Sequence, residues 1–181
     1  MGDAREQDFR CFLECLIDAG SKMKAHYFQL PVAGDEESIF RERVYCYELY
    51  HQLRNVLGDG FPYKLDGEVD KAGHPIIKED MTPDFIVHVP GEMDRNLVVI
   101  EVKSIKVEDR ISRLGKDICN LKTCLQKCKY YRAIMLIYGG GKQEELPSVV
   151  ETKAKSLIGD YKDRILIVWH SGPRKKPEVV C

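Results

Sequence analysis

The feature that most constrains the fold is a series of short apolar segments separated by longer amphipathic ones. Residues 132–138 (RAIMLIY) and 164–169 (RILIVW) are apolar almost throughout, as in strands that are buried on both faces. The neighbouring residues 109–131 and 146–161 carry apolar side chains at helical spacing. Buried strands that alternate with helices indicate an α/β fold with helices on both faces of a sheet.

The first half of the chain adds further elements. Helices are expected at residues 9–24 and 38–57, the second with Ser38 as its N-cap. Residues 63–71 alternate weakly, and residues 84–89 (DFIVHV) and 97–102 (LVVIEV) are rich in strand-forming residues. Residues 90–96 contain Pro, Gly and Asp, so we expect a hairpin there. The whole order predicts one mixed sheet flanked by helices.

A chain of 181 residues is expected to form one compact domain. We expect an N-terminal helical extension at residues 1–37, packed on a core at residues 38–170. Residues 171–181, with two prolines and three consecutive basic residues, are expected to form a flexible tail. No apolar run is long enough to span a membrane and no apolar signal-peptide core is present, so we expect a cytoplasmic protein without membrane contact.

Charge is distributed unevenly along the chain, although the net charge is only −1. Residues 1–102 contain 11 Lys or Arg and 20 Asp or Glu, whereas residues 103–132 contain 9 and 3. A basic segment after an acidic one can hold a phosphate backbone, and the alternative is a solvated helix face. The basic side chains on which this interpretation depends are Lys106, Arg110, Arg113 and Lys116.

Two expected strands bring charged side chains together. Side chains alternate along a strand, so Glu101 and Lys103 point the same way. In the expected hairpin Asp84 lies across from Glu101, about 5 Å away. Carboxylates this close repel each other unless a cation lies between them, and Mg²⁺ prefers oxygen ligands of this kind. Lys103 beside them can orient a water molecule or stabilise charge on a phosphate.

Pro83 and Asp84, followed after sixteen residues by Glu101, Val102 and Lys103, resemble the PD-(D/E)xK signature of restriction-endonuclease-like nucleases. The resemblance implies an αβββαβ core and a nuclease that depends on Mg²⁺ or Mn²⁺. It also implies that Asp84, Glu101 and the backbone carbonyl of Val102 bind the metal, while Lys103 positions or activates the attacking water.

The same resemblance implies a third acid on the helix before the hairpin. Glu42 lies on the helix face that is expected to pack on the sheet, and Glu68 in the preceding strand is the alternative. The expected partner is nucleic acid, DNA in the first place, held in part by the basic helix edge. A homodimer is also compatible with the resemblance.

Two other interpretations stay open from the sequence. The fold could serve as a nucleic-acid-binding module with a weak or inactive site in a defence or repair complex. Alternatively the motif is accidental, with an Asp at a strand end and an exposed Glu–Lys pair at a sheet edge. The sequence does not distinguish DNA from RNA.

Overall fold

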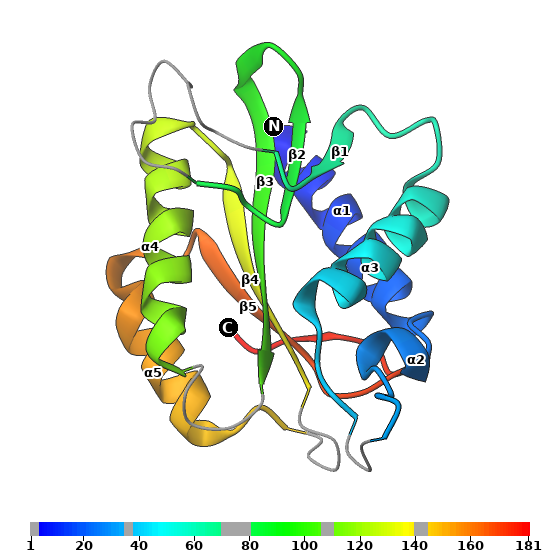
Figure 1. Ribbon diagram of the computed structural model, residues 1–181. Coiled ribbons are helices and arrows are strands. Elements are labelled where there is room, and N and C mark those ends of the chain that lie inside the picture. The colour runs from blue at the N-terminus through cyan, green and yellow to red at the C-terminus, as the bar shows by residue number, and fades with distance from the viewer. Residues whose placement is uncertain (1–3, 35–37, 70–80, 106–110, 140–144) are drawn as a thin grey trace.

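A central sheet separates two layers of helices in the computed structural model (Figure 1). The structure describes residues 4–34, 38–69, 81–105, 111–139 and 145–181, without the side chains of residues 111–113. The chain is therefore a mixed α/β protein with helices on both faces of the sheet, as the alternation of apolar segments predicts.

The sheet has six strands in the order in which they occur along the chain. β1 (Lys64–Gly67), β2 (Phe85–Val89) and β3 (Glu92–Ile105) are antiparallel neighbours. β4 (Arg132–Gly139) and β5 (Ile165–His170) run parallel to β3, and the two-residue β6 (Glu178–Val179) is antiparallel to β5. The mixed sheet predicted from the sequence is confirmed.

The helices divide between the two faces of the sheet (Figure 1). α1 (Ala4–Ser21), the short α2 (Ala25–Phe28) and α3 (Glu42–Leu57) cover one face. α4 (Ile111–Lys127) and α5 (Ser148–Ile158) cover the other, and α5 continues into a 3-10 turn, η2 (Gly159–Tyr161).

Each face of the sheet has its own apolar core. Phe12 of α1 and Leu49 of α3 pack with Ile100 and Leu136 on one side. Ile118 of α4 packs with sheet residues on the other side, in a cluster that also contains Val99, Met135 and Ile167. Alternate residues of β3 therefore face opposite layers, which places Glu101 and Lys103 on the α4 side with Val99. The side chains of α1 belong to the first core, so this helix is an integral part of it.

The hairpin between β2 and β3 is tighter than predicted. β2 ends at Val89 and β3 begins at Glu92, so Pro90 and Gly91 form the turn in place of the expected residues 90–96. Gly91 has φ +85°, which favours glycine because it has no Cβ. The register shifts near His88, and with this irregularity the mostly polar residues 92–96 join the strand.

The start of α3 also differs from the prediction. Helix α3 begins at Glu42 with Arg41 at its N-cap, so the assignment of Ser38 as the N-cap is wrong. The neighbouring Ile39 instead forms an isolated antiparallel bridge with Leu30. The bridge pairs the N–H and C=O groups of Ile39 with those of Leu30, so they are not available for a longer helix α3. The bridge lies between α2 and α3.

Residues 171–181 were expected as a flexible tail, yet they include β6. Val168 pairs with Val179 and Trp169 with Glu178, and the Val180 N–H donates to the Ile167 carbonyl at 2.8 Å. The expectation is therefore wrong for this end of the chain. Among the described residues, no helix is long and apolar enough to cross a membrane.

Candidate active site

The register of the hairpin places Asp84 opposite Glu101. Phe85 pairs with Ile100 in the antiparallel ladder of β2 and β3, so the next position along each strand joins Asp84 to Glu101. β2 begins at Phe85, whereas β3 continues to Ile105 with β4 on its other side. Asp84 and Glu101 therefore lie where β3 extends beyond the start of β2.

Two carboxylates bind the backbone of β3 along this edge. The Val102 N–H donates to Asp84 Oδ2 at 2.6 Å. Two residues further on, the N–H and the hydroxyl of Ser104 donate to Glu42 Oε1 at 3.1 and 3.0 Å. Side chains thus accept the hydrogen bonds that a longer β2 would have accepted. The Val102 carbonyl lies on the same edge, because N–H and C=O of one strand residue point the same way.

Lys103 is held between two acids that come from opposite helical layers. Its Nζ lies 3.4 Å from Glu42 Oε2 at the start of α3 and 3.1 Å from Asp117 Oδ2 of α4. The contact with Asp117 is at ion-pair distance without the alignment of a hydrogen bond. Only 16% of the Lys103 side chain and 13% of the Asp117 side chain are exposed, so water screens this pair weakly.

Glu42, Asp84, Glu101 and Asp117 form what we call the acidic cluster. Burial raises the pKa of Asp84 to about 6; Glu42 and Asp117 add to the rise, while the Val102 N–H and Lys103 oppose it. Burial, then Asp84 and Asp117, raise the pKa of Glu101 well above its ordinary range, against a hydrogen bond from Asn120. Both carboxyls are therefore harder to ionise than usual, first because they are buried and then because other acids lie near them.

The acids of the cluster also shift the pKa of Lys103, and they favour its charged form. Burial lowers the pKa of its ammonium, but Asp117 and Glu42 together outweigh burial, so the pKa is raised. Lys103 is therefore a cation when the protein is folded at neutral pH. Because it faces two acids at once, its ammonium has a fixed place near the pair formed by Asp84 and Glu101.

The donor set of the cluster suits a hard divalent cation. Asp84 and Glu101 offer carboxylate oxygens, and the Val102 carbonyl lies on the same strand edge, as the sequence predicts for a metal site. A cation would also favour the charged forms of both carboxyls, against the burial and the repulsion that raise their pKa values. Within the described parts of the chain, no three His, Cys, Asp or Glu side chains are grouped as around a bound metal.

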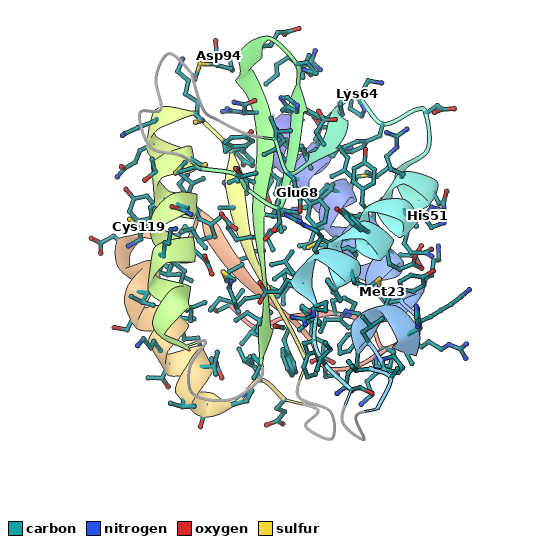
Figure 2. All side chains as sticks on the ribbon, viewed as in Figure 1. Met23, His51, Lys64, Glu68, Asp94 and Cys119 are labelled. Carbon is teal, nitrogen blue, oxygen red and sulfur yellow. The ribbon has the colours of Figure 1, made fainter. Side chains whose placement is uncertain are left out.

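Glu68, the alternative third acid, is hydrogen-bonded to Asp84 through the backbone. Its N–H donates to the Asp84 carbonyl at 3.1 Å, at a position with φ +49°. Its side chain pairs with Arg43 at 2.9 Å and is 39% exposed beside α3 (Figure 2). Of the two alternatives, Glu42 is the acid that contacts Lys103.

Sequence reasoning missed Asp117 and Asn120. Both lie on α4, where Leu114, Ile118 and Leu121 mark the buried face. An Asp three residues after a buried Leu and one before a buried Ile breaks the apolar pattern of that face. This break is the signal that could have identified Asp117. An acid on the buried side of a helix needs a cationic or hydrogen-bonding partner, and here Lys103 supplies one.

The basic helix edge falls mostly outside the described residues. Lys106 and Arg110 lie there, and the side chain of Arg113 is not described. Lys116 is exposed on α4.

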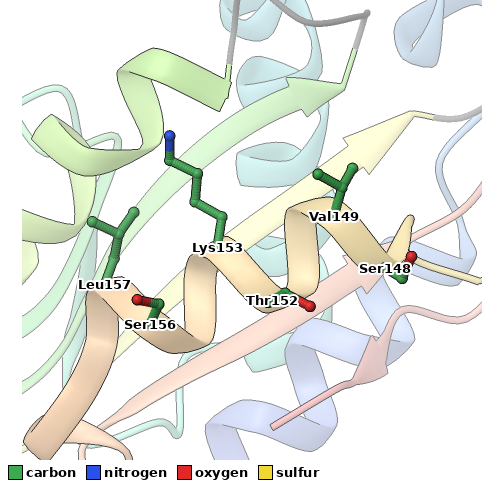
Figure 3. Close-up of a pocket in the computed structure, with 6 residues that line it drawn as sticks. All are labelled: Ser148, Val149, Thr152, Lys153, Ser156 and Leu157. Carbon is green, nitrogen blue, oxygen red and sulfur yellow. The ribbon is translucent and has the colours of Figure 1, made fainter.

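An open depression of about 570 Å³ along α5 is separate from the acidic cluster (Figure 3). All of its lining residues belong to that helix: Ser148, Val149, Thr152, Lys153, Ser156 and Leu157.

Comparison with known proteins does not assign the chain to a family. No protein-family model matches the chain, and no curated protein matches it.

Proposed function

We infer that the protein is a metal-dependent nuclease that hydrolyses phosphodiester bonds in nucleic acid, DNA in the first place. The observation that carries the proposal is the pairing of Asp84 with Glu101 across β2 and β3, with Lys103 two residues further along β3. The succession α3, β1, β2, β3, α4, β4 follows the αβββαβ order of restriction-endonuclease-like enzymes and supports the same conclusion.

Each residue of the cluster has a role in this proposal. Asp84, Glu101 and the Val102 carbonyl would hold Mg²⁺ or Mn²⁺, which when bound supplies charge neutralisation and Lewis-acid polarisation of a phosphate. The Lys103 ammonium would orient the attacking water and stabilise charge on the phosphate. Glu42 and Asp117 hold that ammonium at 3.4 and 3.1 Å, so they act as positioning residues.

Nucleic acid would approach along α4, where Lys116 is exposed, and along the basic residues that precede Lys116 in the sequence: Lys106, Arg110 and Arg113. Lysine and arginine at such an edge bind phosphates without reading sequence. A homodimer would allow two such sites to act on the two strands of a duplex.

The direct test is cleavage of labelled single- and double-stranded DNA and RNA with Mg²⁺ or Mn²⁺. We expect cleavage that EDTA abolishes and that Lys103→Ala lowers by about 100-fold or more, because one positioned charge or proton-transfer group contributes on that scale. Lys64→Ala, which removes an exposed lysine on β1, is the matched control and should cleave normally. A folded Lys103→Ala protein with full activity would contradict the role of Lys103.

A second candidate is a nucleic-acid-binding module with an inactive site. It is favoured by one specific observation: Asp84 and Glu42 already bind backbone N–H groups of β3, and Lys103 is already paired twice. Such a cluster can be self-sufficient without metal. Binding of DNA by a protein that neither binds Mn²⁺ nor cleaves any substrate would favour this candidate.

A further inference from the structure

Two segments far apart in the sequence bring basic side chains together at the junction of α1 and α2. Lys22 and Lys24 flank Met23 between these helices. The Arg174 N–H donates to the Met23 carbonyl at 2.9 Å, which brings the C-terminal turn alongside. All the basic residues concerned are exposed, and we call them the basic patch: Lys22, Lys24, Arg174, Lys175 and Lys176.

The C-terminal turn is fixed in place, as its contacts show. An added Cβ at Gly20 would collide with Pro177 Cγ, so Pro177 packs directly against the end of α1. The Lys175 N–H donates to the Gly172 carbonyl at 3.2 Å, and Arg174 has φ +60°, which is uncommon for a residue with a side chain. β6 follows at once and ties the chain to β5.

The two chain segments that carry the patch contain no acid, although Asp18 and Glu178 lie directly beside them in the sequence. Residues 19–34 and 171–177 contain no Asp or Glu in a chain that has 29 of them. Lys22 pairs with Asp18 at 2.8 Å, and both side chains are about half exposed. The remaining cations of the patch belong to two acid-free segments. A local excess of positive charge on a protein of net charge −1 is a surface for an extended polyanion.

We propose that the basic patch is a second contact for the phosphate backbone of nucleic acid, separate from the acidic cluster. The inference rests on the proposed function, under which the polyanion that binds this protein is nucleic acid. The patch consists of four lysines and one arginine, which suits sequence-independent contact with phosphates. The backbone of the turn that carries Arg174 to Lys176 is anchored through Pro177 and β6, so this part of the chain needs little ordering when nucleic acid docks.

The test is binding of a fluorescein-labelled DNA duplex by fluorescence anisotropy over a range of salt concentrations, in EDTA so that no cleavage occurs. The double variant Lys24→Ala with Lys176→Ala removes one cation from each segment. We expect its affinity to fall by about 3- to 10-fold at low salt and the slope of log affinity against log salt to lose about two units, about one for each phosphate contact.

The matched control is Lys64→Ala with Lys162→Ala, which removes the same charge at exposed positions elsewhere; Figure 2 shows Lys64 well away from Met23. It should keep the wild-type slope, and Lys24→Arg with Lys176→Arg should also keep it. Equal losses in the alanine pair and the control would overturn the proposal, because net charge alone would then explain binding. Binding to phosphatidylserine vesicles with no binding to DNA would overturn it as well.

Cleavage in Mg²⁺ separates this inference from the proposed function. Suppose that the wild-type protein cleaves no substrate, but the alanine pair has a smaller salt slope than wild type. The basic patch would then be supported and the nuclease proposal would be rejected. If cleavage depends on Lys103 but the alanine pair keeps the wild-type salt slope, the nuclease proposal would be supported and the basic patch would be rejected.

Discussion

Asp84 and Glu101 are two buried carboxyl groups whose surroundings disfavour their charge. A carboxyl whose pKa is higher in the folded than in the unfolded protein stabilises the fold below its ordinary pKa. That stability is lost as the pH rises through the folded value. For Asp84 the window runs from its ordinary 3.8 to about 6. At neutral pH the charged pair therefore opposes folding, as expected where a site is organised for a ligand.

Asp84→Asn should make the protein more stable at pH 7.5, by up to about 3 kcal/mol, because the amide keeps an acceptor for the Val102 N–H without the buried charge. The gain should vanish near pH 4, where the wild-type carboxyl is protonated. Urea unfolding at the two pH values measures it. Asp94→Asn on the exposed part of β3 is the control and should change stability little. If Asp84→Asn were less stable than wild type at pH 7.5, the conclusion that the buried charge of Asp84 opposes folding would be wrong.

Asp117 should matter through Lys103. Asp117→Asn removes the charge that lies 3.1 Å from the ammonium while it keeps the size of the side chain. We expect kcat to fall by about tenfold or more with KM nearly unchanged, because a misplaced catalytic group weakens the transition state more than substrate binding. Asp117→Glu should restore part of the loss. Steady-state kinetics of both variants give the answer, and an unaltered kcat in Asp117→Asn would assign the residue a structural role only.

At the scale of the elements, β6 shows how much a short strand contributes. Val180→Pro removes the N–H that donates to Ile167 at 2.8 Å, so we expect a loss of about 1–3 kcal/mol in the free energy of unfolding. Val180→Ala keeps that N–H and should lose less, which separates the backbone bond from side-chain packing. Thermal unfolding of both variants measures the difference. Equal stability of the proline variant and wild type would mean that the end of the chain is loosely attached.

The elements that the sequence predicts well are those with strong apolar patterns. Residues 132–138 and 164–169 are continuous apolar runs and became β4 and β5 with shifts of about one residue. β6 has only two residues and follows two prolines, so nothing local distinguishes it from a tail. Its pairing depends on the edge of β5, which the residues of β6 themselves do not reveal.

The candidate site divides in the same way. The prediction placed Asp84 opposite Glu101 with a longer loop than the structure has; the turn is at residues 90–91, and the register shifts near His88 bring Asp84 and Glu101 opposite each other. The contact between Glu42 and Lys103 depends on how α3 docks, and it came from the resemblance. Asp117 joins the cluster only because α4 packs over β3, which no local pattern specifies.

At the scale of the whole molecule, buried polar contacts join elements that are distant in sequence. Lys103 links α3 and α4 across the edge of the sheet through Glu42 and Asp117. Deeper in the first core, Tyr45 and His170 Nδ1 are hydrogen-bonded at 2.8 Å, and His170 packs edge-on against Phe28. These contacts connect α2, α3 and β5.

His170 should make the whole fold sensitive to acid. Burial lowers its pKa from 6.5 to about 4, so the neutral ring stabilises the fold above pH 6.5, and that stability is lost as the pH falls from 6.5 towards 4. The loss amounts to about 3 kcal/mol at most. The Asp84 carboxyl acts in the opposite sense over much of this range, so the comparison must be between variants. In urea unfolding, the stability of wild type relative to His170→Asn should therefore be lower at pH 5 than at pH 7.5, and an unchanged difference between the two proteins would contradict the prediction.

The most direct test of the metal site is calorimetric titration of the protein with Mn²⁺ at pH 7.5, with Asp84→Asn and Asp94→Asn in parallel. The pairing of Asp84 with Glu101 predicts saturable binding to wild type and to Asp94→Asn, and at least about tenfold weaker binding to Asp84→Asn, because a carboxylate ligand is lost. No binding by the wild-type protein, or equal binding by all three proteins, would contradict a metal site formed by Asp84 and Glu101.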